Sequence, residues 1–323
     1  MLIFIGPNRQ RGNTKKFGEY EKAPKYRHRT YNWLFRTRKL PSATYIFTFV
    51  DRLDPSERRL AGLIFRHINK LGDGFQALND PSRAMNRYRL LRKLHEQGIN
   101  DFNVYLASAA PKPGRFPVFI RRISQSLKPL TDLLPDQETL DRKITAFEAQ
   151  GEPLDDLIVI EFYAKEVAPG IFRKYSTYRA GNRVSANYTI FEANWQVKLG
   201  DIDIVDPKLY EEEAELIRTN AFAEAMREVF DIANIEYGRV DFGLYDGRPQ
   251  IYEINFNPEF RTNVSPSKEP QRKQNVADAV EQRFKDVAAL DMTIEANSRP
   301  NLKNAELTAF RWRFWRNYAP QRY

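Results

Sequence analysis

The chain has 323 residues, with 51 Lys and Arg against 42 Asp and Glu, three His and no Cys. The lack of cysteine excludes disulfides, thiolate metal sites and a cysteine nucleophile, and three scattered histidines argue against a histidine-based zinc site. The composition, 42% hydrophobic and 29% charged, is that of a soluble globular protein, and no apolar run is long enough to cross a membrane. We therefore expect about two domains, no signal peptide, and a cytoplasmic location.

The positive charge is concentrated at the N-terminus. Residues 1–40 hold eleven Lys and Arg against two Glu, which accounts for the whole net charge of +9. One interpretation is a basic arm that recruits a polyanion. The interpretation that we favour is an arm lying on the acidic surface of the protein itself, because the segment has no nucleic-acid-binding motif. A second basic and aromatic segment, residues 311–316, is expected to dock as a tail through its Trp and Phe rings.

The first half of the chain predicts a small lobe of alternating strands and helices. Residues 45–50 are rich in aromatic and β-branched residues and predict a buried strand, and residues 75–78 predict a shorter one. Each is followed by an Asp-Pro pair, a helix start signal, so we expect helices over 54–71 and 80–98. Such alternation is typical of an α/β lobe.

A proline- and glycine-rich connector at residues 111–117 predicts a domain boundary. Beyond it the pattern changes to strands with fewer intervening helices. The expected elements are a strand at 118–122, a helix at 136–150, an apolar strand at 157–163, an antiparallel pair at 172–178 and 183–190, a long helix at 206–235, two strands at 237–244 and 250–256, and a helix at 271–291. Together with the first lobe this predicts an α+β protein.

The last two strands carry the residues most suggestive of chemistry. Val240, Phe242 and Leu244 alternate with polar residues in the first strand, as do Tyr252, Ile254 and Phe256 in the second. Each strand therefore has one apolar face and one face of charged or amide groups. The polar positions are Arg239 and Asp241 in the first strand, and Glu253, Asn255 and Asn257 in the second.

The length of the connecting loop decides whether the two polar faces coincide. A two-residue loop, Asp246-Gly247, would pair Asp241 with Tyr252 and send the carboxylates to opposite sides. A three-residue loop that includes Arg248 would pair Asp241 with Glu253 on one face, and we favour this register. Two carboxylates and an amide oxygen are ligands suited to Mg²⁺.

At this point the sequence resembles the ATP-grasp superfamily, whose members include D-alanine–D-alanine ligase and glutathione synthetase. Asp241, Glu253 and Asn255, followed by Pro258, match the motif that holds two magnesium ions, replaceable by Mn²⁺, on ATP. Arg239 resembles the catalytic arginine near the transferred phosphoryl group. The implied fold is two lobes with antiparallel sheets that clasp the nucleotide, preceded by a reduced pre-ATP lobe.

The resemblance extends less sharply to earlier residues that would bind the nucleotide. Ile160, Glu161 and Phe162 resemble the hinge that holds adenine and ribose. The expected phosphate ligands are Arg121 or Arg122 from one lobe and Arg173 and Lys174 from the other. The stretch 123–129 departs from the family pattern, because it lacks the glycines of the usual phosphate-covering loop.

Charge, composition and the resemblance together predict four segments: a basic arm at 1–44, a small α/β lobe at 45–110, an ATP-grasp domain at 111–291 whose lobes divide near 157–165, and a basic-aromatic tail at 292–323. The implied activity is an ATP-dependent ligase that joins a carboxylate to an amine or thiol through an acyl phosphate. An ATP-grasp kinase and a non-catalytic nucleotide- or polyanion-binding protein are alternatives. We expect Trp195 to be a core residue. Asn187 and Lys198 could face the substrate, although we favour ordinary surface positions for both.

Overall fold

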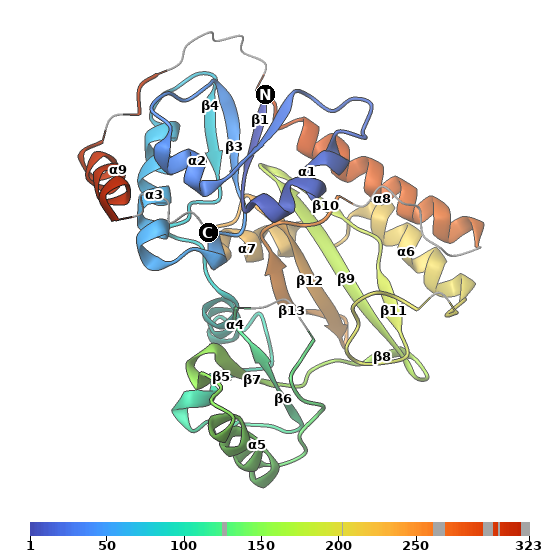
Figure 1. The fold of residues 1–323 in the computed structure, drawn as a ribbon. Coiled ribbons are helices and arrows are strands. Elements are labelled where there is room, and N and C mark those ends of the chain that lie inside the picture. Colours follow the sequence, from blue (N-terminus) through green and yellow to red (C-terminus); the bar gives the residue numbers. More distant parts are fainter. Residues whose placement is uncertain (125–127, 202, 261–268, 293–299, 303, 318–323) are drawn as a thin grey trace.

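Three sheets organise the chain in the computed structural model (Figure 1). The structure describes residues 1–124, 128–201, 203–260, 269–292, 300–302 and 304–317, apart from the side chains of 310 and 313–317. Within these residues, no helix combines the length and the apolar character that crossing a bilayer requires.

The N-terminal domain is a four-stranded parallel sheet with strand order β2-β1-β3-β4. Its strands are β1 (Leu2–Ile5), β2 (Tyr26–Arg29), β3 (Ala43–Phe47) and β4 (Phe75–Leu78). The helices connecting them are η1 (Asn8–Gln10), α1 (Arg11–Phe17), α2 (Tyr31–Arg36), η2 (Val50–Arg52) and α3 (Pro55–Asn69). The prediction that residues 1–44 form an arm is therefore wrong, since they supply two strands and two α-helices of this domain.

Strand β1 shows why the N-terminal segment folds into the domain. Ile3 and Ile5 pack into the core beneath α2 and α3, whereas Leu2 and Phe4 pack into a second core on the other face of the sheet. A run of four consecutive apolar residues is the pattern of a strand buried on both faces in a parallel sheet. The basic residues of the segment lie around this strand, on the helices, on the loops and on the edge strand β2.

The C-terminal segment also belongs to the N-terminal domain. Helix α9 (Ala305–Asn317) lies beside α2 and α3 (Figure 1). Leu302 and Leu307 are buried in the first core of that domain. Trp312 is 67% exposed, so the prediction that this ring docks the tail is wrong. The two leucines hold the segment against the domain instead, together with Arg311, which donates hydrogen bonds to the carbonyls of Phe35 and Thr37.

The two predicted Asp-Pro helix starts have different outcomes. Asp54 caps α3 as expected, accepting hydrogen bonds from the backbone N–H groups of Ser56 and Glu57. Asp80 instead closes a turn by accepting from Ser82, and the following helix, α4 (Arg87–Glu96), begins later with Asn86 as its N-cap. The two starts look alike in sequence because an Asx turn and an N-cap use the same side-chain bond.

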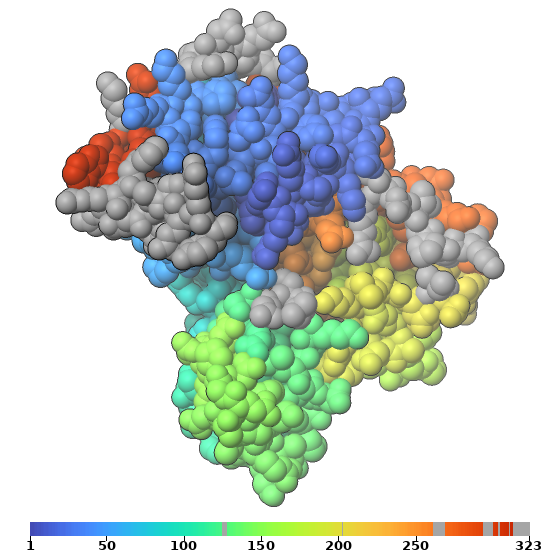
Figure 2. Space-filling model, in the orientation of Figure 1, coloured from blue at the N-terminus to red at the C-terminus, as the bar shows by residue number. Residues whose placement is uncertain are grey.

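The central lobe is an antiparallel sheet with strand order β5-β7-β6. Its elements are β5 (Val104–Leu106), η3 (Ala107–Ala109), β6 (Val118–Arg122), α5 (Gln137–Ala149), η4 (Leu154–Asp156) and β7 (Leu157–Glu161). Because β5 pairs with β7, the predicted boundary at residue 111 falls inside this lobe. The lobe projects below the N-terminal domain (Figure 2).

The third sheet has six antiparallel strands and carries the predicted hairpin at one edge. Its strands are β8 (Glu166–Ala168), β9 (Ile171–Ala180), β10 (Arg183–Ala186), β11 (Ile190–Glu192), β12 (Tyr237–Tyr245) and β13 (Arg248–Asn255). The accompanying helices are α6 (Pro207–Thr219), α7 (Ala223–Ala233) and α8 (Pro270–Ala288). The single long helix predicted at 206–235 is divided at Asn220, whose φ of 51° is left-handed and ends α6.

Phe4→Ala tests whether the N-terminal segment is part of the fold. Phe4 is 2% exposed and contacts the rings of Phe17, Tyr237 and Phe260 edge-on. The truncation should lower the free energy of unfolding by about 3–5 kcal/mol in urea denaturation. Lys15→Ala, at an exposed position of α1, is the control and should change it by less than about 0.5 kcal/mol. An unchanged midpoint for Phe4→Ala would restore the arm interpretation.

Candidate nucleotide-binding site

The hairpin of β12 and β13 has the predicted pairing, although the predicted loop is wrong. Asp246 and Gly247 form a two-residue turn with φ angles of 48° and 79°, and Tyr245 pairs with Arg248 across it. A shift of register then occurs between Phe242 and Asp241. Asp241 consequently pairs with Glu253, as favoured from the sequence.

A β-bulge at Tyr252 produces this shift. Phe242 pairs with Ile251 and Asp241 with Glu253, so Tyr252 is the extra residue of its strand. Its ring lies over Gly243, where a Cβ atom would collide with the phenol. A residue larger than glycine at 243 would therefore exclude this position of the Tyr252 ring.

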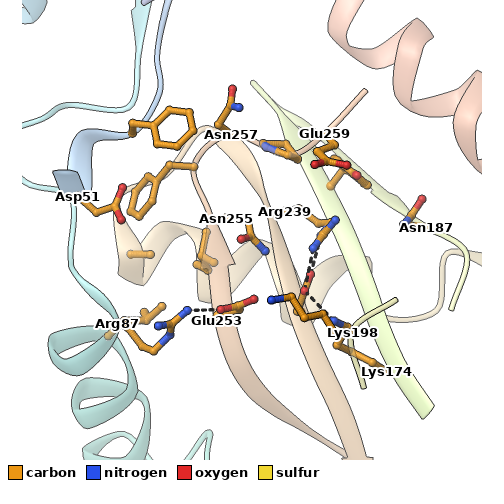
Figure 3. A pocket seen from close by; sticks show the side chains of 18 of the residues that line it. Asp51, Arg87, Lys174, Asn187, Lys198, Arg239, Glu253, Asn255, Asn257 and Glu259 are labelled. Carbon is orange, nitrogen blue, oxygen red and sulfur yellow. Dashed lines mark hydrogen bonds and ion pairs between the residues drawn. The ribbon is translucent and has the colours of Figure 1, made fainter. Parts of the chain in front are cut away.

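Cationic side chains surround the two carboxylates (Figure 3). Arg239 binds Asp241 through two bonds of 2.6 and 2.8 Å, and Lys174 Nζ lies 3.5 Å from the same carboxylate. Glu253 forms an ion pair with Arg87, and Arg121 Nη2 lies 3.7 Å from it. Four cations from α4, β6, β9 and β12 therefore converge on two acids.

The surrounding charges alter the pKa values of the cluster. Burial alone would raise the pKa of Glu253, but the positive charges of Arg87, Arg121 and Lys174 outweigh it and lower the pKa. Burial and the neighbouring Arg87 lower the pKa of Arg121 to about 10, against the opposing effect of Glu253. The carboxylate of Glu253 is therefore ionised and the guanidinium of Arg121 charged at neutral pH.

Arg239 is held from both sides. Burial opposes its charge, but Asp241 and Tyr178 raise the pKa of its guanidinium. Burial alone would raise the pKa of Tyr178, but Arg283, whose Nη1 donates to the phenol at 3.0 Å, and Arg239 lower it. These contacts fix the guanidinium of Arg239 against the wall of the cavity.

Two adjoining chambers meet at this cluster. The larger, of 310 Å³, is bordered by residues from the N-terminal domain and the third sheet, including Gln10, Asp51, Arg239 and Asn255. The smaller, of 140 Å³, is lined largely by apolar and aromatic side chains of the central lobe. Four residues line both chambers: Lys174, Lys198, Asp241 and Glu253.

The structure brings most of the predicted residues to these chambers. Ile160, Glu161, Phe162 and Arg121 line the smaller chamber, and Arg239 and Asn255 the larger one. The carboxylate of Glu161, however, accepts bonds of 2.8–2.9 Å from the N–H groups of Asn103 and Gly114 and from the Tyr105 hydroxyl. It orders the segments that border the chamber.

Two predicted phosphate ligands point away from the chambers. Arg122 forms an ion pair with Glu152 at 2.6 Å. Arg173 forms an ion pair with Glu212 at 2.8 Å and lies over the rings of Tyr175 and Phe191. Because neighbouring strand residues face opposite sides, only Arg121 and Lys174 of these pairs reach the site.

Neither Arg87 nor Trp195 was expected at the site from the sequence, yet both border the chambers. Lys198 also borders them, and Asn187 is buried and lines the larger one. A substrate-facing position was the less favoured of the two interpretations for Asn187 and Lys198. Arg87 lies in the first turn of α4 among several other basic residues, so nothing in the local sequence distinguishes it.

Of the stretch 123–129 that lacks glycine, residues 125–127 lie outside the described part of the chain. Ile123 lines the larger chamber, and Lys128 and Pro129 line the smaller one. Ser124 is bound to Asp156 through both its N–H and its hydroxyl, at 3.0 and 2.6 Å. The flanks of the stretch therefore border both chambers.

No model of a known protein family and no curated protein sequence matches the chain. Solved structures do. The ATP-grasp ligase PsnB, complexed with a minimal precursor, matches with 8% identity and a TM-score of 0.50 over 90% of this chain and 98% of its own. The VanG D-Ala:D-Ser ligase from Enterococcus faecalis matches with 11% identity and a TM-score of 0.50, over 89% of this chain and 98% of its own. A D-alanine–D-alanine ligase from Bacillus anthracis matches with 14% identity and a TM-score of 0.47, over 90% of this chain and 97% of its own. At such identities the likeness is one of fold.

Glu253→Gln tests the charge cluster through stability. A carboxylate whose pKa is lowered on folding stabilises the native state above its unfolded pKa of about 4.3, and loses that contribution as the pH falls through its folded pKa. At pH 7 the variant should unfold with a free energy lower by about 3 kcal/mol, because Arg87 and Arg121 lose their counter-charge. The difference from the unmodified protein should narrow below about pH 4.

The matched control is Glu148→Gln, which removes an exposed carboxylate of α5. Its unfolding free energy should follow that of the unmodified protein at every pH. A difference for Glu253→Gln that stays constant from pH 7 to pH 3 would contradict the proposed charge environment.

Proposed function

This chain has the ATP-grasp fold, as the sequence resemblance predicted, and we propose that it binds ATP with Mg²⁺ and acts as an ATP-dependent ligase. The observation that carries the proposal is the bulged hairpin. It places Asp241 and Glu253 side by side, between an apolar chamber and a polar one.

The smaller chamber suits a nucleobase. Phe102, Phe119, Phe162 and Trp195 are among the aromatic residues that line it, and Trp195 contacts the rings of Phe119 and Phe162. Aromatic faces bind flat heterocycles by stacking. The base of ATP would lie here, with its phosphates directed toward the four residues shared by the two chambers.

The charge at the junction suits a triphosphate. Arg87, Arg121, Lys174, Lys198 and Arg239 provide five cations against the two carboxylates. Guanidinium and ammonium groups bind phosphate oxygens through strong charge-assisted hydrogen bonds. The surplus of positive charge would be neutralised by a bound polyphosphate.

The residues present fit a magnesium ion carried by the nucleotide. Among the described residues no group of three His, Cys, Asp or Glu could hold a metal, so the set of protein ligands that we propose is two carboxylates and one amide oxygen. Asn255 follows Glu253 on the same strand, and its buried Nδ2 has no hydrogen-bond partner in the described part of the chain. A buried N–H group of this kind would donate to an oxygen of the bound phosphate, and the amide Oδ1 is the atom that could bind the metal.

Asp241, Glu253 and Asn255 would hold the metal, with two ions as the family resemblance implies. The metal would neutralise charge that develops on the phosphate oxygens. Lys174 and Arg121 would orient the phosphates, and Arg239 would stabilise negative charge on the oxygen of the reacting carboxyl group.

The proposed reaction has two bond-forming steps. A carboxylate oxygen of the substrate attacks the γ-phosphorus, and the bond from the γ-phosphorus to the bridging oxygen breaks. The products of this step are ADP, which departs, and an acyl phosphate. An amine nitrogen or thiol sulfur then attacks the acyl carbon, the carbon–oxygen bond to phosphate breaks, and the nucleophile releases its proton. The larger chamber, which reaches Gln10 and Asp51 of the N-terminal domain, would accommodate both substrates.

Arg121→Ala and Arg122→Ala form a matched pair for nucleotide binding. The first removes a cation that lines the smaller chamber, and the second removes its neighbour on the opposite side of β6. We expect Arg121→Ala to weaken ATP binding at least about tenfold and Arg122→Ala less than about twofold, by isothermal titration calorimetry with Mg²⁺. Equal effects, or no ATP binding by the unmodified protein, would contradict the proposed site.

A trapping experiment tests the reaction class. Hydroxylamine would replace the amine, so incubation with ATP, Mg²⁺ and a panel of carboxylic acids should yield ADP, phosphate and a hydroxamate detectable as its ferric complex. Glu253→Gln with Asn255→Ala should abolish this turnover. ADP together with a stable phosphoester of an added alcohol would identify a kinase instead.

A further inference from the structure

The loop between β11 and α6 contributes to both chambers at once. Trp195, Gln196, Val197 and Lys198 line the smaller chamber, and Lys198 and Leu199 line the larger. Only two residues separate Trp195 from Lys198, so a single short segment reaches from the aromatic pocket to the phosphate cations. We call residues 193–200 the spanning loop.

One carboxylate holds the phosphate end of the spanning loop. Glu192 Oε1 accepts three backbone N–H bonds, from Lys198 at 2.8 Å, Leu199 at 2.5 Å and Gly200 at 2.7 Å. Gly200 has a φ of 91°, a left-handed conformation that turns its N–H toward the same oxygen as its neighbours. Successive N–H groups arranged in this way form an anion-binding concavity, and here the anion is the chain's own carboxylate.

The other end of the spanning loop is held by aromatic contacts with the central lobe. The centroid of the Trp195 ring lies 4.9 Å from the ring centroid of Phe119 on β6 and 5.5 Å from that of Phe162 after β7. Trp195 is half-buried and borders the apolar chamber, so one part of its ring packs against protein while another borders the space for the base. The two ends of the loop are thus anchored independently.

We propose that Glu192 is a positioning residue that, through the backbone of the spanning loop, sets Lys198 against the distal phosphates, while Trp195 contacts the base. This inference rests on the proposed function, because it assigns roles at the same nucleotide site. Glu192 does not itself line either chamber and acts only through the backbone of residues 198–200. It is therefore distinct from the residues that touch the nucleotide.

The two roles have separable consequences. Loss of the Trp195 ring removes a contact with the base, which AMP, ADP and ATP share. Loss of the Glu192 carboxylate releases the backbone at Lys198, which affects only nucleotides whose phosphates extend to that residue. A general loss of folding would not discriminate among nucleotides by phosphate number.

Titration calorimetry of the full chain with AMP, ADP and ATP in Mg²⁺ tests the proposal. Trp195→Ala should weaken the binding of all three nucleotides by a similar factor of about ten. Glu192→Ala should weaken the binding of ATP by about tenfold and the binding of AMP by less than about twofold. Glu192→Gln keeps an acceptor oxygen in the same place and should recover ATP affinity to within about threefold of the unmodified protein.

Glu166→Ala is the control, because Glu166 accepts a backbone N–H bond from Gly170 at 2.9 Å in another exposed turn. It should leave all three affinities unchanged. An equal loss of AMP and ATP affinity in Glu192→Ala, no rescue by Glu192→Gln, or an unchanged profile in Trp195→Ala would each overturn the inference while the proposed function stands. If the unmodified protein binds none of the nucleotides, the proposed function fails and the inference fails with it.

Discussion

The burial of two carboxylates side by side is the constraint on which the site depends. Asp241 is 1% exposed, and the side chain of Glu253 retains 18% of its accessible surface. Neighbouring acids in such surroundings repel one another and lose hydration, so each requires cations of its own. Those cations come from four elements in different parts of the chain, and the charge cluster therefore joins the central lobe and helix α4 to the third sheet.

The same requirement relates packing to the proposed activity. Cations that neutralise the buried acids also exceed them in number, which leaves a positive region between an apolar chamber and a polar one. A nucleoside triphosphate has the complementary distribution, with a flat heterocycle at one end and negative charge at the other. The spanning loop contributes an aromatic ring to the first region and an ammonium group to the second.

Local pattern predicted the hairpin, but only the fold identified which of two neighbouring cations reaches the cavity. Arg121 and Arg122, like Arg173 and Lys174, are adjacent basic residues whose sequence does not say which one faces the cavity. The pairing of Asp241 with Glu253 was predicted from a three-residue loop, whereas a bulge at Tyr252 beyond a two-residue turn produces it. At the bulge the Tyr252 ring lies over Gly243, a contact that loop length does not reveal.

The sequence by itself determined the alternation of β12 and β13, the residue types suited to a magnesium-bound triphosphate, and the resemblance to the ATP-grasp superfamily, because these depend on neighbours along the chain. Tertiary structure decided the rest. Leu2–Ile5 became a buried strand because a sheet and two cores were available on its two faces, although its surroundings in sequence are basic. Arg87 and Trp195 joined the site because distant segments pack beside them, a proximity that no local pattern encodes.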